Sequence, residues 1–155
     1  MKIEIKSRFD SKVLFTAEAA RLLLALEAAI KSDANLYGAN LSGAMNLSPL
    51  IQAQTSILPA GNLVGWKKCK NNIIVKLLIP QKALRSNATS RKCRANYVEV
   101  LRVYGADKGY SQHDGTTEYA KGATVKCDNW NPDRWTECGG GIHFFLTREE
   151  AEAYQ

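Results

Sequence analysis

The sequence has few of the residues from which metal centres and catalytic sites are usually built. It contains two histidines and four cysteines, and no two cysteines form the CxxC pair that is typical of zinc sites. Recognised phosphate-loop motifs and closely paired acid-base carboxylates are also missing. We therefore expect no metal site and no cofactor, and we expect the cysteines to be reduced structural thiols.

Long apolar segments are absent as well. No run of about 18 apolar residues occurs, so the sequence predicts no membrane-spanning helix and no membrane partner. Residues 1–6 alternate charged side chains with Ile instead of forming the apolar centre of a signal peptide. Both observations favour a soluble protein of the cytoplasm.

Basic side chains, in contrast, outnumber acidic ones. The 155-residue chain has 21 Lys and Arg against 15 Asp and Glu, which gives a formal net charge of +6. Such a surplus favours anionic partners. The hydrophobic content of 45% is enough for one compact domain with a small N-terminal appendage.

The N-terminal part has a clear periodicity. Residues 2–6 and 12–15 alternate polar and apolar side chains on either side of a polar turn, which predicts a β-hairpin. Thr16 is a suitable N-cap for a helix whose apolar residues recur at spacings of three and four until Ser32-Asp33. We interpret residues 1–33 as a cap, or alternatively as a segment whose leucine stripe makes a dimerisation helix.

A short repeat follows. Residues 34–43 are two copies of a five-residue unit, with Leu36 and Leu41 at the centres and a small residue two places earlier. The extra residue Met45 then breaks the period, and residues 34–62 contain no further clear unit. About three units are normally needed before a repeat can bury its apolar face. These two must therefore pack against other parts of the chain.

The remaining residues, 63–155, predict an antiparallel domain of the α+β class. Asn71-Asn72 suits a tight turn because Asn tolerates positive φ, and Gln81 to Arg85 could form a helical turn. Thr147 can cap a short last helix that runs through Tyr154. The predicted strands cover residues 64–70, 73–79, 97–104, 124–127 and 141–146.

Several motifs in this part resemble a known family. They are Gly65-Trp66-Lys67-Lys68, Val75 to Pro80, Arg91-Lys92-Cys93-Arg94-Ala95, Cys138, Gly141 to Phe145, Ala151 and Tyr154. The pattern resembles an uncharacterised C-terminal domain that accompanies pentapeptide repeats in bacteriophage and some bacterial proteins. The hairpin, helix and five-residue units are similar to the start of those proteins, although the repeat is vestigial here. The resemblance implies a phage-like origin and no known catalytic residues.

The densest group of cations lies in the C-terminal part. Five basic residues fall within thirteen positions with no carboxylate among them, and Ser86 and neighbouring polar residues add hydrogen-bond donors. Such a loop could surround a small, multiply charged phosphate ligand, whereas duplex nucleic acid would need a longer basic face. The alternative is a solvated turn that enters a strand. The cations are Lys82, Arg85, Arg91, Lys92 and Arg94.

Tyr119 and His143 complete the candidate ligand site. His143 follows three glycines, 139–141, which would let a ligand approach the backbone, although a lone histidine in an apolar strand is more often a hydrogen-bonded structural residue. Tyr119 could stack on a base. Residues 111–114 read Ser-Gln-His-Asp, but adjacent loop residues rarely form a catalytic triad.

Three functions remain open from the sequence. The first is a non-enzymatic, phage-type accessory protein that sequesters a nucleotide-like signal of host defence, in the host cytoplasm. The second is a module that grips an acidic host protein, and the third, which is weaker, is a nucleotide-modifying enzyme that uses His143 with Tyr119 or Cys138. Open edges of the short repeat also favour a homodimer or a higher homo-oligomer.

Overall fold

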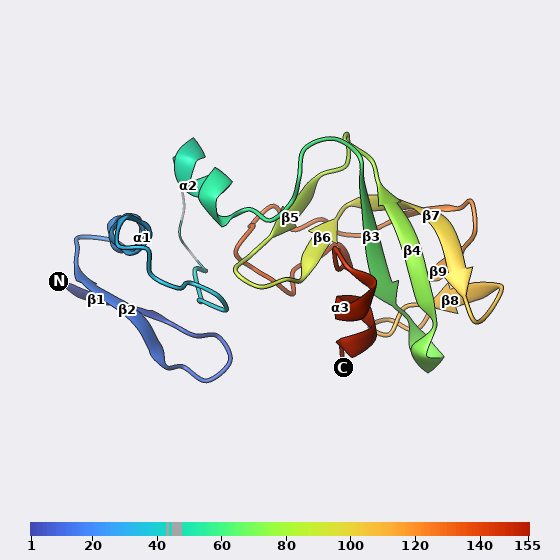
Figure 1. Ribbon diagram of the computed structural model, residues 1–155, viewed down its shortest axis with the longest axis horizontal. Helices are drawn as coiled ribbons and strands as arrows, with labels where there is room; N and C mark the ends of the chain where they lie inside the picture. The colour runs from blue at the N-terminus through green and yellow to red at the C-terminus, as the bar shows by residue number, and fades with distance from the viewer. Residues whose placement is uncertain (43, 45–47) are drawn as a thin grey trace.

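The computed structural model of the protein describes residues 1–42, 44 and 48–155. An N-terminal part and a larger β-rich part lie side by side along the longest axis (Figure 1). Both predicted features of the α+β class, the N-terminal hairpin with its helix and the antiparallel C-terminal part with a short last helix, are confirmed. Among the described residues, no helix has the length and apolar character needed to cross a membrane.

The N-terminal hairpin pairs β1 (Lys2–Lys6) with β2 (Val13–Glu18), and α1 (Leu22–Lys31) packs against both strands. The prediction that Thr16 caps the helix was wrong. Thr16 lies opposite Glu4 inside β2, and the pairing continues to Glu18, so the helix begins after Arg21. Strand pairing, a tertiary interaction, here outweighs the local capping preference of Thr.

The two five-residue units share one hydrogen-bond pattern. In each, the Asn side chain accepts a bond from the amide two residues later, and the carbonyl of the central Leu accepts one from the amide three residues later. These bonds are Tyr37 N to Asn35 Oδ1 (2.9 Å), Ser42 N to Asn40 Oδ1 (3.2 Å), Ala39 N to Leu36 O (2.9 Å) and Ala44 N to Leu41 O (3.0 Å). The predicted break at Met45 lies outside the described residues. A short helix, α2 (Pro49–Thr55), follows.

The C-terminal part is built on a four-stranded antiparallel sheet of order β10-β7-β4-β3. Its strands are β3 (Leu63–Lys68), β4 (Ile74–Ile79), β7 (Tyr97–Tyr104) and β10 (Thr124–Lys126). The turn between β3 and β4 contains a short 3₁₀ segment, η1 (Lys70–Asn72). Asn71 and Asn72 have φ of 57° and 58°, so the predicted tight turn is confirmed.

Two smaller sheets extend this part. One has the order β11-β6-β5, with β5 (Arg85–Asn87), β6 (Cys93–Ala95) and β11 (Ile142–Phe144), and the other pairs β8 (Lys108–Tyr110) with β9 (Glu118–Ala120). The predicted helical turn over residues 81–85 was wrong. Ala83 N donates to Pro80 O (2.9 Å) in a tight turn, and Arg85 already belongs to β5, where pairing with β6 sets its conformation.

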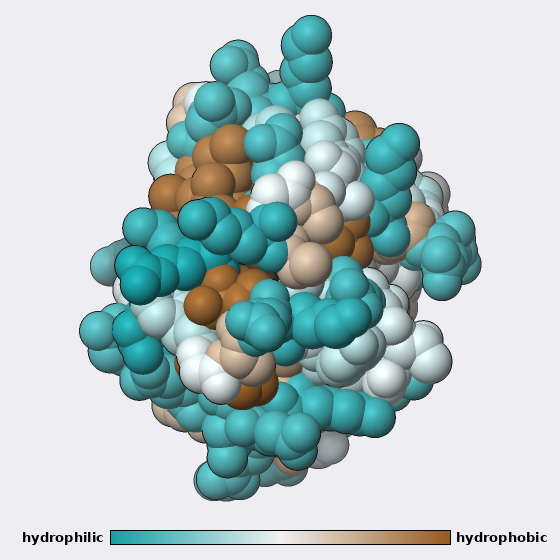
Figure 2. All heavy atoms as spheres, turned by 90° about the vertical axis from the view of Figure 1, so that its right-hand side faces the viewer, coloured by the Kyte–Doolittle hydropathy of each residue, from teal (hydrophilic) through white to brown (hydrophobic). Residues whose placement is uncertain are grey.

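The last helix, α3 (Arg148–Ala153), begins as the sequence predicts. Thr147 Oγ1 accepts from the amide of Glu150 (3.2 Å), and the Glu150 carboxylate accepts from the amide of Thr147 (3.1 Å), which forms a capping box. The helix packs on β3, in front of the sheet in Figure 1. Hydrophilic side chains cover most of the end of the molecule that Figure 2 shows, with small separate hydrophobic patches between them.

The N-terminal core is completed by a residue from the C-terminal part. Trp135 is only 4% exposed and packs in a cluster with Ile5, Leu26 and Leu41, while its indole N–H donates to Ala44 O (3.1 Å). A partly buried ion pair also joins Arg8 to Glu137 (3.0 Å). The two parts are therefore held together by apolar burial and by buried polar contacts.

We predict that Trp135 is a main determinant of the stability of the N-terminal part. Trp135→Ala should lower the free energy of unfolding by about 3–5 kcal/mol, because it removes a buried aromatic side chain. Trp135→Phe should cost less, roughly 1–3 kcal/mol, because packing is largely kept while the carbonyl of Ala44 loses its donor. Urea unfolding followed by circular dichroism measures both. Equal losses for the two variants would contradict this account.

Candidate functional site

Arg94, one of the predicted ligand residues, is a buried structural cation. It is 1% exposed, and its guanidinium donates to the carbonyls of Asn131 (2.9 Å), Asp133 (2.6 Å) and Gly140 (2.9 Å). Its guanidinium carbon lies 4.9 Å from the ring centroid of Trp130. Burial lowers the pKa of Arg94 from its usual value. The hydrogen bonds of the Arg94 guanidinium therefore hold the 129–141 loop in place.

The glycines of this loop allow its backbone to approach Arg94 and Asn129 closely. A Cβ at Gly140 would overlap the carbonyl oxygen of Asn129, and one at Gly139 would lie 3.0 Å from Nη1 of Arg94. Gly141 has φ of 146°, which favours glycine. The three glycines that the sequence analysis connected with ligand access therefore serve to pack the loop against Arg94.

The other predicted cations are spread over separate contacts. Arg85 donates to the carbonyls of Gly61 (2.7 Å) and Pro59 (3.1 Å), and Arg91 forms an ion pair with Glu150 (2.5 Å). Lys82 lies in the exposed turn before β5. Ser86 Oγ is buried and has no hydrogen-bond partner among the described residues. The structure does not bring these four residues together around one ligand.

Lys92 and His143, in contrast, line the same cavity, which has a volume of about 410 Å³. It opens at the end of β3, beside β11 and the chain segment that follows α3. Tyr119 does not line it. Tyr119 is buried in the core, where the Lys67 ammonium lies 5.5 Å from its ring centroid. The charged, polar and thiol side chains that line the cavity include Lys67, Lys68, Lys92, His113, Cys138 and His143.

The three lysines of the cavity contact neutral groups. Lys67 Nζ donates to the carbonyl of His143 (3.3 Å), Lys68 Nζ to the carbonyl of Tyr154 (2.8 Å), and Lys92 Nζ to the hydroxyl of Tyr154 (2.9 Å). Within the described part of the chain, none of them forms an ion pair. Their positive charge is therefore not cancelled by a direct ion pair, although Asp114 attracts Lys67 at longer range, and an anion in the cavity would meet three ammonium groups.

Burial and repulsion among the cations govern the titration of this site. Burial, together with the positive charges of Lys92 and Lys67, lowers the pKa of His143 to about 4, and the contact of Nε2 with the carbonyl oxygen of Gly139 (3.2 Å) opposes this shift only in part. Burial also lowers the pKa of Lys67. At neutral pH His143 is thus uncharged and can donate or accept one hydrogen bond through a ring nitrogen.

Nearby Asp114 is already occupied by its own loop. One of its carboxylate oxygens accepts from the amides of Thr116 (2.7 Å) and Thr117 (2.8 Å). Hydrogen bonds of this kind hold the pKa of Asp114 well below its usual value, despite an opposing effect of burial. The carboxylate therefore stays charged, but it is directed into a local turn and does not pair with the cavity lysines.

Lys67 and Lys68 line the cavity but were not predicted from the sequence as site residues. Both belong to the Gly65-Trp66-Lys67-Lys68 motif, which was read only as part of a family resemblance. Adjacent residues of a strand point to opposite faces, yet both reach this cavity because it lies at the end of β3. Two adjacent lysines at the end of a predicted strand were the available signal.

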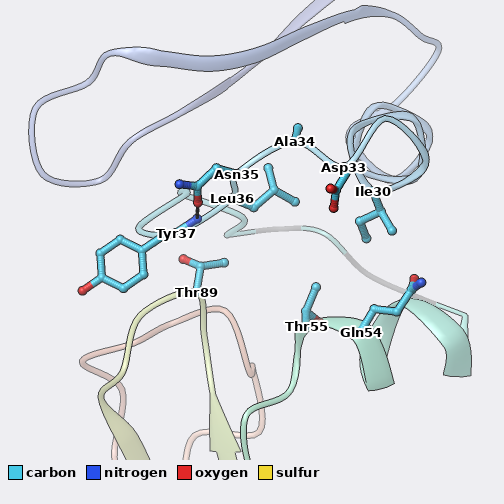
Figure 3. A pocket seen from close by; sticks show the side chains of 9 residues that line it. All are labelled: Ile30, Asp33, Ala34, Asn35, Leu36, Tyr37, Gln54, Thr55 and Thr89. Atoms are coloured by element: carbon cyan, nitrogen blue, oxygen red, sulfur yellow. Dashed lines mark hydrogen bonds between the residues drawn. The ribbon is translucent and has the colours of Figure 1, made fainter.

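A larger cavity, of about 610 Å³, lies between the N-terminal part, α2 and Thr89 (Figure 3). Among the described residues that line it, Asp33 is charged and none is a cation, and the Asn35 side chain accepts the bond from the Tyr37 amide. The smaller cavity is therefore the better candidate for an anion site. Over the described ranges of the chain, no three His, Cys, Asp or Glu side chains are placed to hold a metal ion.

A comparison with protein families finds a match. The model of a family of unknown function matches residues 54–151, which is well over half of the chain and includes every residue named above for the smaller cavity except Tyr154. Searches of curated proteins and of solved structures gave no significant match. The expected similarity to an uncharacterised domain is thereby supported.

We predict that His143 makes stability depend on pH. Its folded-state pKa of about 4 lies below the ordinary 6.5, so between these values the unfolded chain binds a proton that the folded protein does not. The free energy of unfolding should therefore fall as pH drops from 6.5 to 4, by up to about 3 kcal/mol. Urea titrations give the free energy of unfolding at each pH, and its slope against pH over this range should be steeper for wild type than for His143→Gln. Parallel curves would show that His143 titrates normally.

Proposed function

The chain belongs to DUF5758, a family of unknown function, and from that premise we propose that it is a non-enzymatic protein that binds a small phosphate-bearing ligand in the cavity of Lys67, Lys68, Lys92 and His143. The observation that carries the proposal is the set of three lysines that face one cavity and contact only neutral partners. A phosphate group would supply the missing negative charge.

The shape of the cavity favours a ligand of nucleotide size. Its volume of about 410 Å³ falls in the range of small-molecule sites. Phe145 and Tyr154 line it with ring centroids 5.3 Å apart, so a planar base could pack against an aromatic surface while the phosphate contacts the lysines. The exposed amide of Gln112 adds a hydrogen-bonding group at the cavity wall.

Capture fits the local chemistry better than catalysis. The imidazole of His143 is held uncharged at neutral pH, and its Nε2 already lies within hydrogen-bond distance of the Gly139 carbonyl. Lys92 Nζ lies 3.6 Å from the Cys138 sulfur, but a nucleophile also needs a base that is free to accept its proton. Enzymatic modification of the ligand is therefore the weaker alternative.

The wider role that we infer is that of a phage-type accessory protein which sequesters a nucleotide signal of the host, in the host cytoplasm. The shared hydrogen-bond pattern of residues 34–44 supports the interpretation of the short repeat as a vestigial pentapeptide repeat. The net charge of +6 agrees with an anionic ligand. It agrees equally with an acidic host protein, so the experiment must separate the two.

We predict that a nucleotide or another phosphate ligand protects the protein against heat. At a hundredfold excess over Kd, binding to the folded state adds about 2.7 kcal/mol, which raises the Tm by roughly 5–10 °C for a chain of this size. Lys92→Ala should weaken binding at least tenfold and so remove about half of that gain in free energy. The measurement is thermal unfolding against a panel of linear and cyclic nucleotides.

Lys82→Ala is the matched control, because it removes the same charge from an exposed turn outside the cavity. It should leave the shift unchanged. Arg94→Ala is unsuitable, since it would release the 129–141 loop. Mass analysis of the ligand afterwards distinguishes capture from turnover: intact ligand supports capture, and altered ligand means an enzyme. If no phosphate compound shifts the Tm, the proposal fails and an acidic protein becomes the leading partner.

A further inference from the structure

The outer face of the four-stranded sheet combines aromatic rings with basic side chains. In β7, a strict alternation would place Arg102 and Tyr104 on the inner face with Val98 and Val100, which are both buried. The register instead shifts where Lys76 pairs with Arg102 and Leu77 with Val100. This bulge turns Arg102 and Tyr104 outward, as bulges commonly re-aim side chains.

The resulting face has two rows of paired residues. Trp66, Lys76 and Arg102 lie opposite one another across β3, β4 and β7, and the next row contains Lys68, Ile74 and Tyr104. The rings of Trp66 and Tyr104 have centroids 5.9 Å apart and are tilted by 32°. Because neighbouring strands are about 4.8 Å apart, each row spans roughly 10 Å.

Cations lie against both rings. Lys76 Nζ is 5.5 Å from the centroid of Trp66, and the guanidinium carbon of Arg102 is 5.0 Å from that of Tyr104. Arg148, at the start of α3, reaches over Tyr104 (4.8 Å) and Trp66 (5.9 Å). Trp66 and Tyr104 are partly exposed, and guanidinium planes stack on bases as well as on aromatic side chains, so a base can stack on the guanidinium groups as well as on the exposed part of the rings.

The charge of this face is mainly positive. Four cations, Lys68, Lys76, Arg102 and Arg148, outnumber the carboxylates that lie near them among the described residues, which are Glu99, Glu149 and Glu152. Glu152 pairs with Arg148 (2.7 Å), whereas Lys76 and Arg102 form no ion pair with any residue that the structure describes.

A hollow on the same face could hold one base. Its volume is about 410 Å³, and Tyr104, Lys68 and Asn72 are among the residues that line it, beside Gly105 and Arg148. The ring of Tyr104 offers a stacking surface, and the Asn72 amide offers both a donor and an acceptor for the edge of a base. Lys68 and Arg148 line the hollow as well and can contact a phosphate, although Arg148 is paired with Glu152, which also lines it.

We propose that this face binds single-stranded nucleic acid. Unpaired bases can stack on Trp66, Tyr104 and the guanidinium planes, while Lys76 and Arg102 contact phosphates. Duplex nucleic acid keeps its bases inside and cannot use the rings, and an acidic protein would match the charge without filling the stacking surfaces. The site is separate from the ligand cavity, although Lys68 lies at the boundary and lines both.

The test is fluorescence anisotropy of a labelled fifteen-residue oligothymidylate with the full-length protein at several salt concentrations. Four cations that contact phosphates predict a slope of log K against log salt of about −3, since each contact on a single strand contributes roughly −0.7. Arg102→Ala should weaken binding about tenfold and reduce the slope by roughly 0.7. Lys12→Ala, which removes an exposed lysine from the distant hairpin, should change neither.

Stacking is tested at Tyr104 with a matched pair. Tyr104→Phe keeps the ring and should bind normally, whereas Tyr104→Leu keeps an apolar side chain without the ring and should weaken binding about tenfold. Thermal unfolding of each variant checks that it is folded. Lys92→Ala, which disables the ligand cavity, should leave oligonucleotide binding intact, so this proposal and the preceding one can fail independently.

Four results would overturn the assignment. They are no binding at 50 mM salt, equal affinity for a duplex of the same length, equal loss of affinity in Tyr104→Phe and Tyr104→Leu, and a loss in Lys92→Ala as large as that in Arg102→Ala. The second result would show that the face attracts polyanions by charge alone, and the last would place the oligonucleotide in the cavity.

Discussion

The buried guanidinium of Arg94 is the contact on which the arrangement of the whole protein depends. Three carbonyls of the 129–141 loop accept its hydrogen bonds, and one of them, the carbonyl of Gly140, also accepts from the amide of Asn131 (3.1 Å). Because this loop is fixed, Trp135 lies in the N-terminal core, Glu137 pairs with Arg8, and Cys138 lines the ligand cavity. Arg94 thereby positions both the contact between the N-terminal and C-terminal parts and one wall of the cavity.

The sequence was informative where structure follows from local rules. Alternation located β1, β3, β4 and β7, the Asn71-Asn72 turn followed from the tolerance of Asn for positive φ, and the capping box located α3. Strands of three residues, such as β5 and β8, are too short to show a period. The start of α1 was misplaced because pairing of Thr16 with Glu4 is a property of the hairpin and not of the helix that follows.

The candidate site was harder to predict, because a basic residue in the sequence does not reveal what neutralises it. Arg85, Arg91 and Arg94 look alike as a run of cations, yet they bind carbonyls of residues 59 and 61, a carboxylate of α3 and carbonyls of the 129–141 loop, respectively. Lys67 belongs to the site because β11 and the end of the chain approach β3, which is a long-range event. His143 was predicted from the glycines before it, but its lowered pKa depends first on its burial and then on the charges of Lys92 and Lys67.

The contact between Trp135 and Ala44 also constrains the order in which the protein can fold during synthesis. The two residues are separated by 91 positions, so the apolar side chains of residues 3–44 stay partly uncovered until most of the chain has left the ribosome. At about 5–20 residues per second this delay lasts roughly 5–20 s. The N-terminal part is made first but its core can be completed only after Trp135 has been made, and a chain terminated before that residue would keep its hydrophobic surface exposed to other proteins.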